Sequence, residues 1–322
     1  MSQNKPLVTI AMMTYNQEKY VRDSVRGLLS QTYEPLEIVI SDDCSTDRTW
    51  DIICEEVDSY KSHGGIHSNI VLNRNEKNLG IAKHSDLVGT FKHGEITVAC
   101  GGDDISFPNR VERIVEVFEG VPSATWVMSQ AEVIDEQGVS MGITVGYGKW
   151  WPLGAASAWR NGIVNRFSRK MPVGAYEDWI MAMRALMFGE YVNIDEVLLK
   201  YRHGGVSTRK GTYEDIHHRG ARAMIQSFVC ILADLEDMKS QLRTDVYHEI
   251  YDRITKLKIQ QEGIRDLLEK DSIVSRWNAL RKVRFPKLLS TGNLGYLLCV
   301  LPKSIGRPLL HAYWSIRNFV KC

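Results

Sequence analysis

Apolar runs and helix-patterned segments alternate through residues 7–129 of this 322-residue chain, and this alternation restricts the possible folds most strongly. Strand-type runs occupy residues 7–13, 36–40, 70–72, 95–100 and 124–129. Helical spacing separates them, at residues 17–29, 47–57, 82–91 and 109–118. Strands that alternate with helices of this length form a parallel sheet flanked by helices. The pattern therefore predicts an α/β fold with a mixed, largely parallel sheet.

Polar residues follow four of these expected strands. The segments, in chain order, are Thr14-Tyr15-Asn16, Asp42-Asp43, Asn78-Leu79-Gly80 and Asp103-Asp104. In open sheets of this kind, ligands bind outside the carboxyl ends of the strands. We therefore expect the four segments to meet at one edge of the sheet and to form a binding site there.

Gly101-Gly102-Asp103-Asp104 is the most informative of these strand ends. Two adjacent carboxylates at the end of a buried strand repel each other and are costly to desolvate. A divalent cation such as Mg²⁺ or Mn²⁺ removes this cost, because it prefers hard oxygen ligands. The glycines would let an anionic ligand approach the backbone. An exposed acidic turn before the helix near Asn109 explains the same residues, and both interpretations stay open at this point.

Charge is distributed unevenly along the chain, although the net charge is only +1. No acidic residue follows Asp271, whereas nine Lys and Arg side chains do. Residues 1–271 carry 31 basic and 39 acidic side chains. Aromatic residues such as Trp277 and Trp314 accompany the basic ones, a composition that favours an anionic membrane surface. Nucleic acid would attract the same charge, but no nucleic-acid motif accompanies it, so we expect no nucleic-acid partner.

The chain shows no sign of secretion or of a membrane-spanning helix. Its six cysteines form neither a CxxC nor a Cys/His zinc pattern, and the first residues are polar. The longest apolar run near the end, residues 294–301, is far shorter than the roughly 20 residues that a spanning helix needs. We therefore expect a cytoplasmic protein that is peripheral on the inner face of the cell membrane.

The pattern changes after residue 210. Long helical segments at 215–237 and 246–268 predict a helical C-terminal extension over residues 211–271, followed by a basic amphipathic tail over 272–322. The helices could serve as a bundle, as a platform for the acceptor or as the interface of a homo-oligomer. Residues 204–209 contain glycines and are expected to close over a bound ligand.

Six motifs in order resemble those of glycosyltransferase family 2. They cover residues 8–16, 30–33 with 36–49, 78–80, 102–104, 176–179, and 201–203 with Ser207. The resemblance spans residues 7–208. It implies a GT-A (Rossmann-like) fold and inverting sugar transfer from a nucleotide-sugar.

The resemblance also implies roles for residues at the donor site. Tyr15 would lie against the nucleobase, Thr14 and Asn16 would shape the loop, and Asp43 would accept the imide N–H of a uracil-type base. Further donor-site candidates are Glu18, Asn78, Lys83, Asp103 and Arg202. A helix-capping turn with Asp47 is the alternative for Asp43, and a solvated helix surface is the alternative for Lys83.

The metal site is implied at the same strand end. Asp104 would be the main ligand of Mn²⁺ or Mg²⁺, with Asp103 at the metal or at the ribose. His203 would ligate the metal or donate to the diphosphate, unless it is a structural histidine. Many members of the family carry an acid where this chain has Gly101. The diphosphate and water must then complete the metal shell, so we expect weak metal affinity when the donor is absent.

Catalysis is implied at Glu177-Asp178. An inverting transfer needs a carboxylate that takes the proton of the acceptor hydroxyl. Asp178 would be this base, Glu177 would position the acceptor, and Trp159 would line the acceptor pocket. Two acids at the N-terminus of a helix also favour its dipole, and a tryptophan in this region can be plain core, so these structural interpretations stay beside the functional ones.

The expected function is metal-dependent inverting transfer of a hexosyl or N-acetylhexosaminyl group, in polysaccharide biosynthesis. The donor would be a UDP-sugar, and the acceptor a hydroxyl of a cell-surface glycan or a lipid-linked saccharide. One alternative is a non-catalytic nucleotide-sugar-binding scaffold subunit of a glycan assembly complex. Another is a dinucleotide-dependent oxidoreductase, but no GxGxxG motif follows the first strand.

Overall fold

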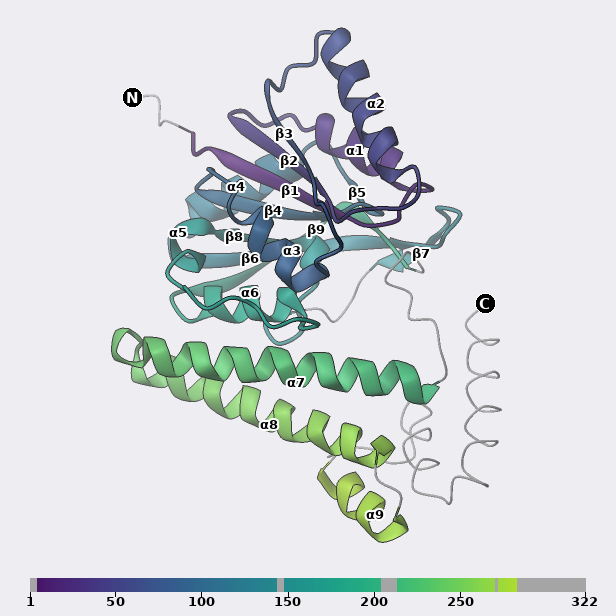
Figure 1. The fold of residues 1–322 in the computed structure, drawn as a ribbon. Helices are drawn as coiled ribbons and strands as arrows, with labels where there is room; N and C mark the ends of the chain where they lie inside the picture. The colour runs from purple at the N-terminus through teal and green to yellow at the C-terminus, as the bar shows by residue number, and fades with distance from the viewer. Residues whose placement is uncertain (1–4, 144–147, 204–212, 270–271, 283–322) are drawn as a thin grey trace. The chain divides into compact units, whose positions relative to one another are not determined.

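The computed structural model describes residues 5–143, 148–203, 213–269 and 272–282 (Figure 1). The chain forms two compact units, residues 1–208 and 209–322, and each is described by itself. The expected boundary at residue 210 lies outside the described residues.

A mixed sheet forms the centre of the first unit. Its described strands follow the order β3-β2-β1-β4-β8-β6-β9-β5, and β7 pairs with β6. The first four strands in this order are parallel to one another. They are β3 (Asn69–Arg74), β2 (Leu36–Asp42), β1 (Val8–Thr14) and β4 (Ile96–Gly101). This confirms the expected mixed, largely parallel sheet.

The short reversed strands β5, β7 and β8 and the long strands β6 and β9 complete the sheet. Strand β8 is antiparallel to both β4 and β6, and β6 is parallel to β9. Strands β5 and β7 are antiparallel to β9 and β6. Their bounds are β5 (Ile105–Ser106), β6 (Ala124–Ile134), β7 (Ser140–Ile143), β8 (Ser157–Arg160) and β9 (Glu190–Arg202).

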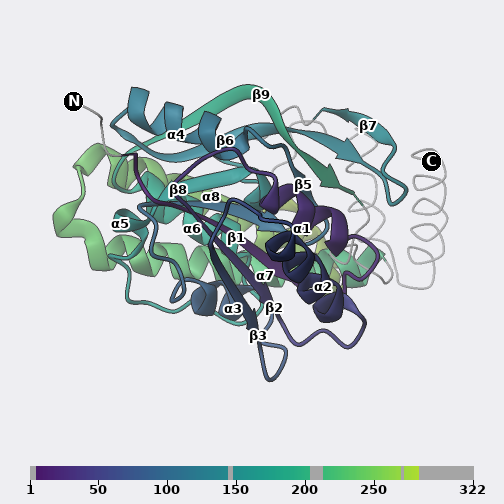
Figure 2. The same cartoon turned by 90° about the horizontal axis from the view of Figure 1, so that it is seen from above.

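Helices cover both faces of this sheet (Figures 1 and 2). Side chains alternate along β1, so Val8, Ile10 and Met12 pack with helices α1, α2 and α4, whereas Ala11 packs with α3. Helix α6 contacts β6 and β8, and α3 contacts α6. The bounds are α1 (Val21–Leu29), α2 (Thr49–Ser62), α3 (Ile81–Val88), α4 (Arg110–Gly120), α5 (Asn161–Val164), α6 (Glu177–Leu186) and the 3-10 turn η1 (Gly154–Ala156). Burial of both faces explains the continuous apolar runs of the parallel strands.

Two helices begin later than the sequence pattern predicts. Helix α1 begins at Val21, because residues 17–20 form a separate turn in which the backbone N–H of Tyr20 donates to Gln17 O at 2.9 Å. Helix α2 begins at Thr49, two residues after the expected cap at Asp47. The Asp47 carboxylate still accepts from Thr49 N at 3.0 Å and from Thr49 Oγ1 at 2.6 Å. It therefore provides a hydrogen-bond acceptor for a backbone N–H at the start of the helix.

Strand register brings the polar strand ends together. Thr14 lies opposite Asp42 on the neighbouring strand, and Met13 lies opposite Gly101. Backbone hydrogen bonds continue past the strands, from Asp43 N to Thr14 O at 2.9 Å and from Gly102 N to Met13 O at 3.1 Å. The residues that follow β1, β2 and β4 therefore share one edge of the sheet.

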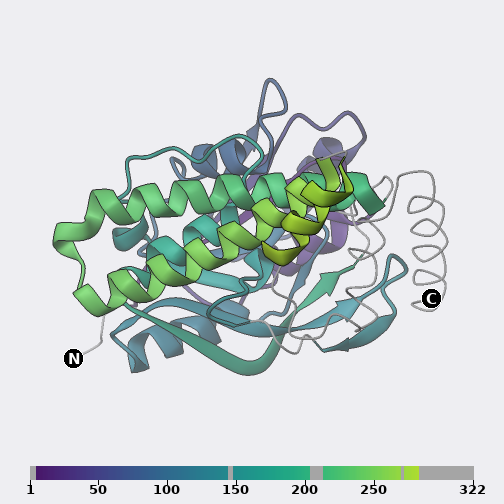
Figure 3. The same ribbon diagram turned by 90° about the horizontal axis from the view of Figure 1, so that it is seen from below.

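The second unit contains the two long helices expected from the sequence (Figure 3). Helix α7 packs on α8, and α8 packs on α9. Their bounds are α7 (Tyr213–Met238), η2 (Lys239–Gln241), α8 (Thr244–Glu269) and α9 (Ile273–Lys282). Phe228, Ile231, Leu235 and Ile254 are fully buried in this unit. Over the described residues, no helix has both the length and the apolar character needed to cross a membrane.

Candidate functional site

A cavity of about 670 Å³ opens at the carboxyl ends of β1, β2 and β4, within the first unit. Its size suits a nucleotide or small-molecule ligand. The predicted site residues that line it are Thr14, Tyr15, Asp43, Asn78, Asp103, Asp104, Trp159, Glu177 and Asp178. Residues from separate chain segments therefore meet at one place, as expected of a site at the edge of a parallel sheet.

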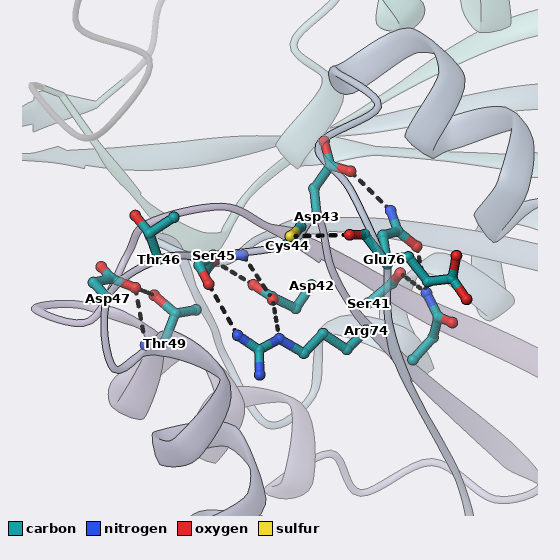
Figure 4. Close-up of polar contacts among 12 residues, drawn as sticks. Ser41, Asp42, Asp43, Cys44, Ser45, Thr46, Asp47, Thr49, Arg74 and Glu76 are labelled. Carbon is teal, nitrogen blue, oxygen red and sulfur yellow. Dashed lines mark hydrogen bonds and ion pairs between the residues drawn. The ribbon is translucent and has the colours of Figure 1, made fainter.

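The last residue of β2, Asp42, and the acid that follows it, Asp43, have different environments (Figure 4). Asp42 is fully buried, accepts from Ser45 N at 2.9 Å and lies 3.5 Å from Arg74 Nε, so its contacts hold the loop together. Asp43 lines the cavity instead. Its Oδ1 accepts from Asn75 Nδ2 and from the backbone N–H of Leu79, both at 2.8 Å.

The second oxygen of Asp43 is less engaged. Oδ2 accepts from Gly80 N at 2.9 Å, its one hydrogen bond among the described residues. A carboxylate oxygen can accept two hydrogen bonds. Asp43 therefore presents a fixed acceptor that can take an N–H group from a ligand in the cavity.

The acidic pair after β4 is almost fully buried beside the cavity. Asp104 is 2% exposed, and its Oδ1 accepts from the backbone N–H of Arg202 at 2.9 Å. Burial and the neighbouring Asp103 raise the pKa of Asp104, and burial raises the pKa of Asp103. Two carboxylates held at such cost favour a positively charged partner.

Gly101 leaves room for such a partner. A Cβ atom at this position would lie 2.7 Å from Asp104 Oδ2 and 3.1 Å from Asp103 Oδ1, so oxygens of both carboxylates converge on the glycine. The described part of the chain holds no group of three or more His, Cys, Asp and Glu residues suited to a metal ion. The pair therefore fits a hard cation only if a ligand or water supplies further oxygens.

A second acidic pair, at the N-terminus of α6, lines the same cavity. Asp178 Oδ1 accepts from Trp179 N at 2.8 Å, and the backbone N–H of Gly154 also bonds to this carboxylate. Burial raises the pKa of both acids, and the Asp178 charge raises the pKa of Glu177 further. Two backbone N–H groups stabilise the Asp178 carboxylate and oppose the effect of burial on its pKa.

Apolar side chains also form part of the cavity wall. Trp126, Leu153, Trp159 and Met181 all line it. The Lys92 ammonium lies 5.2 Å from the centre of the Trp159 ring, and burial lowers the pKa of Lys92 to about 8. Trp159 therefore packs as core on one side and borders the cavity on the other, so both interpretations of this residue describe part of its position.

Asn16 and Glu18 lie outside the cavity lining, although both were candidates for the donor site. Asn16 Oδ1 accepts from Thr46 N at 2.8 Å, and Glu18 Oε2 accepts from Arg48 N at 3.1 Å. These bonds join the loop after β1 to the loop after β2. Both side chains thus support the loop that carries Tyr15.

Three expected ligand-binding cations are also placed elsewhere. Lys83 and His203 are exposed and line neither described cavity. The Arg202 guanidinium is buried, donates to Asp103 O at 3.1 Å and to Asp135 O at 2.9 Å, and lines a separate cavity of about 380 Å³. Backbone carbonyls therefore accept from Nε and Nη1 of this guanidinium. The expected closing segment, residues 204–209, lies outside the described residues.

Sequence reasoning missed several polar residues of the cavity wall, among them Gln17 and His84. Gln17 accepts from Thr14 Oγ1 at 2.6 Å, and its side chain also bonds to the Asp103 carboxylate. The His84 ring is buried, with Nε2 2.7 Å from Ser41 Oγ, and burial lowers the pKa of His84. His84 and the buried Val88 are four residues apart on one helix face, a spacing that could have identified His84 as facing the sheet.

This site combines a nucleotide-sized cavity with two acidic pairs at the edge of an α/β sheet, an arrangement typical of enzymes that transfer groups from phosphorylated donors. Residues 9–155 match the family model for glycosyl transferase family 2. An uncharacterized glycosyltransferase of Haemophilus influenzae is 32% identical over 136 residues, which cover 42% of this chain and 40% of the relative. Residues 9–155 of the chain therefore match glycosyltransferase family 2, and the chain covers less than half the length of its first curated relatives.

Solved structures show the same fold. TarS of Staphylococcus aureus (residues 1–349), in complex with UDP-GlcNAc, matches with a TM-score of 0.57 at 16% identity and covers 91% of each chain. The mannosyltransferase PcManGT of Pyrobaculum calidifontis, in complex with GDP-Man and Mn²⁺, has a TM-score of 0.60 at 15% identity and covers 97% of this chain and 85% of that one. The fold is therefore the GT-A fold that the resemblance implied.

Proposed function

We propose that this protein transfers a sugar from a nucleoside-diphosphate donor to an acceptor hydroxyl, with inversion at the anomeric carbon. One observation supports this most directly: Asp103-Asp104 and Glu177-Asp178 come from separate segments yet line one cavity. One acidic pair suits a cation that holds a diphosphate, and the other suits proton abstraction.

The donor would lie along the ends of β1 and β2. Tyr15 offers a ring to the nucleobase, and Asp43 offers its remaining acceptor position to an imide N–H, with Thr14 and Asn78 beside them. Uracil and guanine both carry such an N–H group. TarS was solved with UDP-GlcNAc and PcManGT with GDP-Man, so both donor classes are bound by proteins of this fold. We propose a UDP-sugar carrying a hexosyl or N-acetylhexosaminyl group.

The transfer needs one base and no covalent enzyme intermediate. Asp178 takes the proton of the acceptor hydroxyl while the hydroxyl oxygen bonds to the anomeric carbon and the bond from that carbon to the diphosphate oxygen breaks. Asp103 and Asp104 would hold Mn²⁺ or Mg²⁺, and a cation bound there stabilises the charge of the departing diphosphate. Burial and the Asp178 charge raise the pKa of Glu177, so a protonated Glu177 would donate a hydrogen bond to the acceptor.

Metal affinity should depend on the nucleotide. The described residues supply two carboxylates at the cation position and no larger ligand group, so Mn²⁺ alone should bind weakly. UDP adds diphosphate oxygens, and Mn²⁺ should then bind about tenfold tighter or more, a coupling of at least about 1.4 kcal/mol. Titration of Mn²⁺ by calorimetry with and without UDP measures this, and equal affinities would contradict the proposed shared site.

A non-catalytic nucleotide-sugar-binding subunit is the second candidate, because Gly101 removes one family acid. The intact pair Glu177-Asp178 with raised pKa values favours the enzyme. Release of UDP from UDP-GlcNAc, or of GDP from GDP-mannose, by the purified protein with Mn²⁺ separates the two. Tight donor binding without any release, with or without saccharide acceptors, would favour the scaffold.

We propose that the basic tail attaches the protein to an anionic membrane, where a glycan or lipid-linked acceptor would be found. Its support is the sequence, because nine basic and no acidic side chains follow Asp271. Deletion of residues 272–322 should abolish sedimentation with vesicles that contain phosphatidylglycerol. Vesicles of phosphatidylcholine alone provide the control. Retained binding of the truncated protein to anionic vesicles would refute the attachment.

A further inference from the structure

Arg110, the first residue of α4, is fully buried and touches both ends of the segment that carries the acidic pair. Its Nη2 donates to the backbone oxygen of Ala99 at 2.9 Å, and its Nη1 donates to Ser106 Oγ at 2.8 Å. Ala99 precedes Asp103-Asp104 in the chain and Ser106 follows them. One guanidinium therefore fixes the base of this loop on both sides.

The same guanidinium reaches the other side of the cavity. Nη2 also donates to the backbone oxygen of Ala155 at 2.6 Å, in the 3-10 turn η1. The preceding residue, Gly154, provides a backbone N–H to the Asp178 carboxylate. A Cβ atom on Gly154 would lie 3.1 Å from the Cβ of Asp178, so the turn packs tightly against the proposed base.

A simple packing role does not require this residue type. Burial of a guanidinium is costly, and the Nε atom of Arg110 has no hydrogen-bond partner among the described residues. The Asp104 charge offsets part of the cost, as each group stabilises the charged form of the other. Only arginine combines a permanent charge with a planar fork that reaches three acceptors in different directions.

We propose that Arg110 is a positioning residue. It holds the acidic pair after β4 at a fixed distance from turn η1, which contacts Asp178, so that donor and acceptor meet at the reacting distance. This rests on the proposed transferase function. Arg110 lines no part of the described cavity, so it acts through Asp104 and through Gly154 and not by contact with substrate. Misplacement of reacting groups by about 1 Å can cost about 100-fold in rate.

Arg110→Lys separates the charge of Arg110 from its hydrogen bonds, because lysine keeps the charge but cannot reach all three acceptors. We expect kcat to fall about 10- to 100-fold, while the dissociation constant for UDP with Mn²⁺ changes less than about threefold. Hydrogen exchange of the amides at residues 153–157 should become faster. Arg110→Gln, which is neutral, should show the same loss of kcat, whereas Mn²⁺ binding in the presence of UDP should stay equal or become tighter, because the charge that is removed has the sign of the cation.

Arg160→Lys is the matched control. Arg160 also donates to two backbone oxygens, those of Ala124 at 2.9 Å and Phe118 at 2.7 Å, but it contacts neither acidic pair nor turn η1. This variant should keep the wild-type kcat and the wild-type exchange rate at residues 153–157. If Arg110→Lys behaves like Arg160→Lys in both measurements, the positioning role is refuted.

The exchange experiment also keeps this inference separate from the proposed function. If the wild-type protein transfers no sugar from any donor, the transferase proposal fails. Hydrogen exchange at residues 153–157 and Mn²⁺ binding with UDP still report on Arg110 in that case. Faster exchange in Arg110→Lys then supports the proposed link between the acidic pair after β4 and turn η1, and unchanged exchange overturns it.

Discussion

Asp178→Asn should reduce sugar transfer by about 10²- to 10⁴-fold, the range expected when a general base is removed. The asparagine Oδ1 atom can still accept from the backbone N–H of Trp179, so the local structure should persist. The donor cation site comes from another segment, and the dissociation constant for UDP with Mn²⁺ should stay within about twofold. Steady-state kinetics and calorimetry on the same sample measure both quantities.

Stability gives an independent prediction for the same variant. Burial raises the pKa of Asp178, so the folded state binds the proton more tightly than the unfolded state does. Between the ordinary aspartate pKa, about 4, and the raised value, stability therefore falls as pH rises. Asparagine carries no charge, so the Asp178→Asn protein should unfold at an equal or higher temperature at neutral pH. A lower unfolding temperature would mean that lost activity reflects damaged folding.

Glu177→Gln is the matched control. The pKa of Glu177 is raised by burial and by Asp178, so a protonated glutamate is its expected form while Asp178 is ionised, and glutamine imitates that form. This variant should keep most of the transfer activity at neutral pH. The wild-type kcat should fall on the acid side at a pH above the ordinary aspartate range, about 4, because Asp178 must lose its proton to act. Equal losses in Glu177→Gln and Asp178→Asn would contradict the assignment of the base.

Asp104→Asn has the second largest expected effect, and it should act on both binding and transfer. A metal acting on a leaving group contributes several kcal/mol, so kcat/KM should fall about 100-fold or more. The amide oxygen can still accept from Arg202 N, which keeps the β9 contact. Affinity for Mn²⁺ in the presence of UDP should fall in parallel.

The same substitution should not destabilise the unliganded protein. It removes one of two buried like charges, whose repulsion and burial raise the pKa of Asp104. The unfolding temperature without ligands should therefore rise or stay equal. Asp23→Asn, at an exposed site outside the main cavity, provides the control and should change neither activity nor Mn²⁺ binding. Wild-type activity in Asp104→Asn, with wild-type dependence on Mn²⁺, would refute the role of Asp104.

The parallel strands and the location of the site followed from the sequence for one physical reason. Strands β1, β2 and β4 are buried on both faces, so their sequences are continuous apolar runs that end where polar residues begin. Parallel pairing alone then places those ends at one edge of the sheet. Thr14, Asp43 and Asp103-Asp104 all line the cavity for this reason.

The rest of the sheet depends on contacts between distant segments. Strand β8 (Ser157–Arg160) has only four residues and no apolar run, and its position between β4 and β6 comes from pairing with both. Such a segment has no local signal that distinguishes it from a loop. The residue type of Trp159 therefore suggested a place beside the cavity, but only the pairing of β8 with distant strands determines it.

Charged side chains were the least predictable part of the site. Lys83 and Arg202 are reasonable phosphate partners by charge, yet Lys83 lies on the exposed side of α3 and Arg202 binds backbone oxygens of Asp103 and Asp135. Competing acceptors within the fold decide where a guanidinium donates, and the sequence does not show them. For the same reason, the contacts of Arg110 could not be predicted from the sequence.

A crystal structure of the protein with UDP and Mn²⁺ would show whether the two acidic pairs serve one reaction. Anomalous scattering would locate the manganese ion. We expect manganese within coordination distance of an Asp104 oxygen and of the diphosphate, in the cavity that Asp178 also lines. Manganese bound away from Asp104, or UDP bound outside this cavity, would contradict the proposed mechanism.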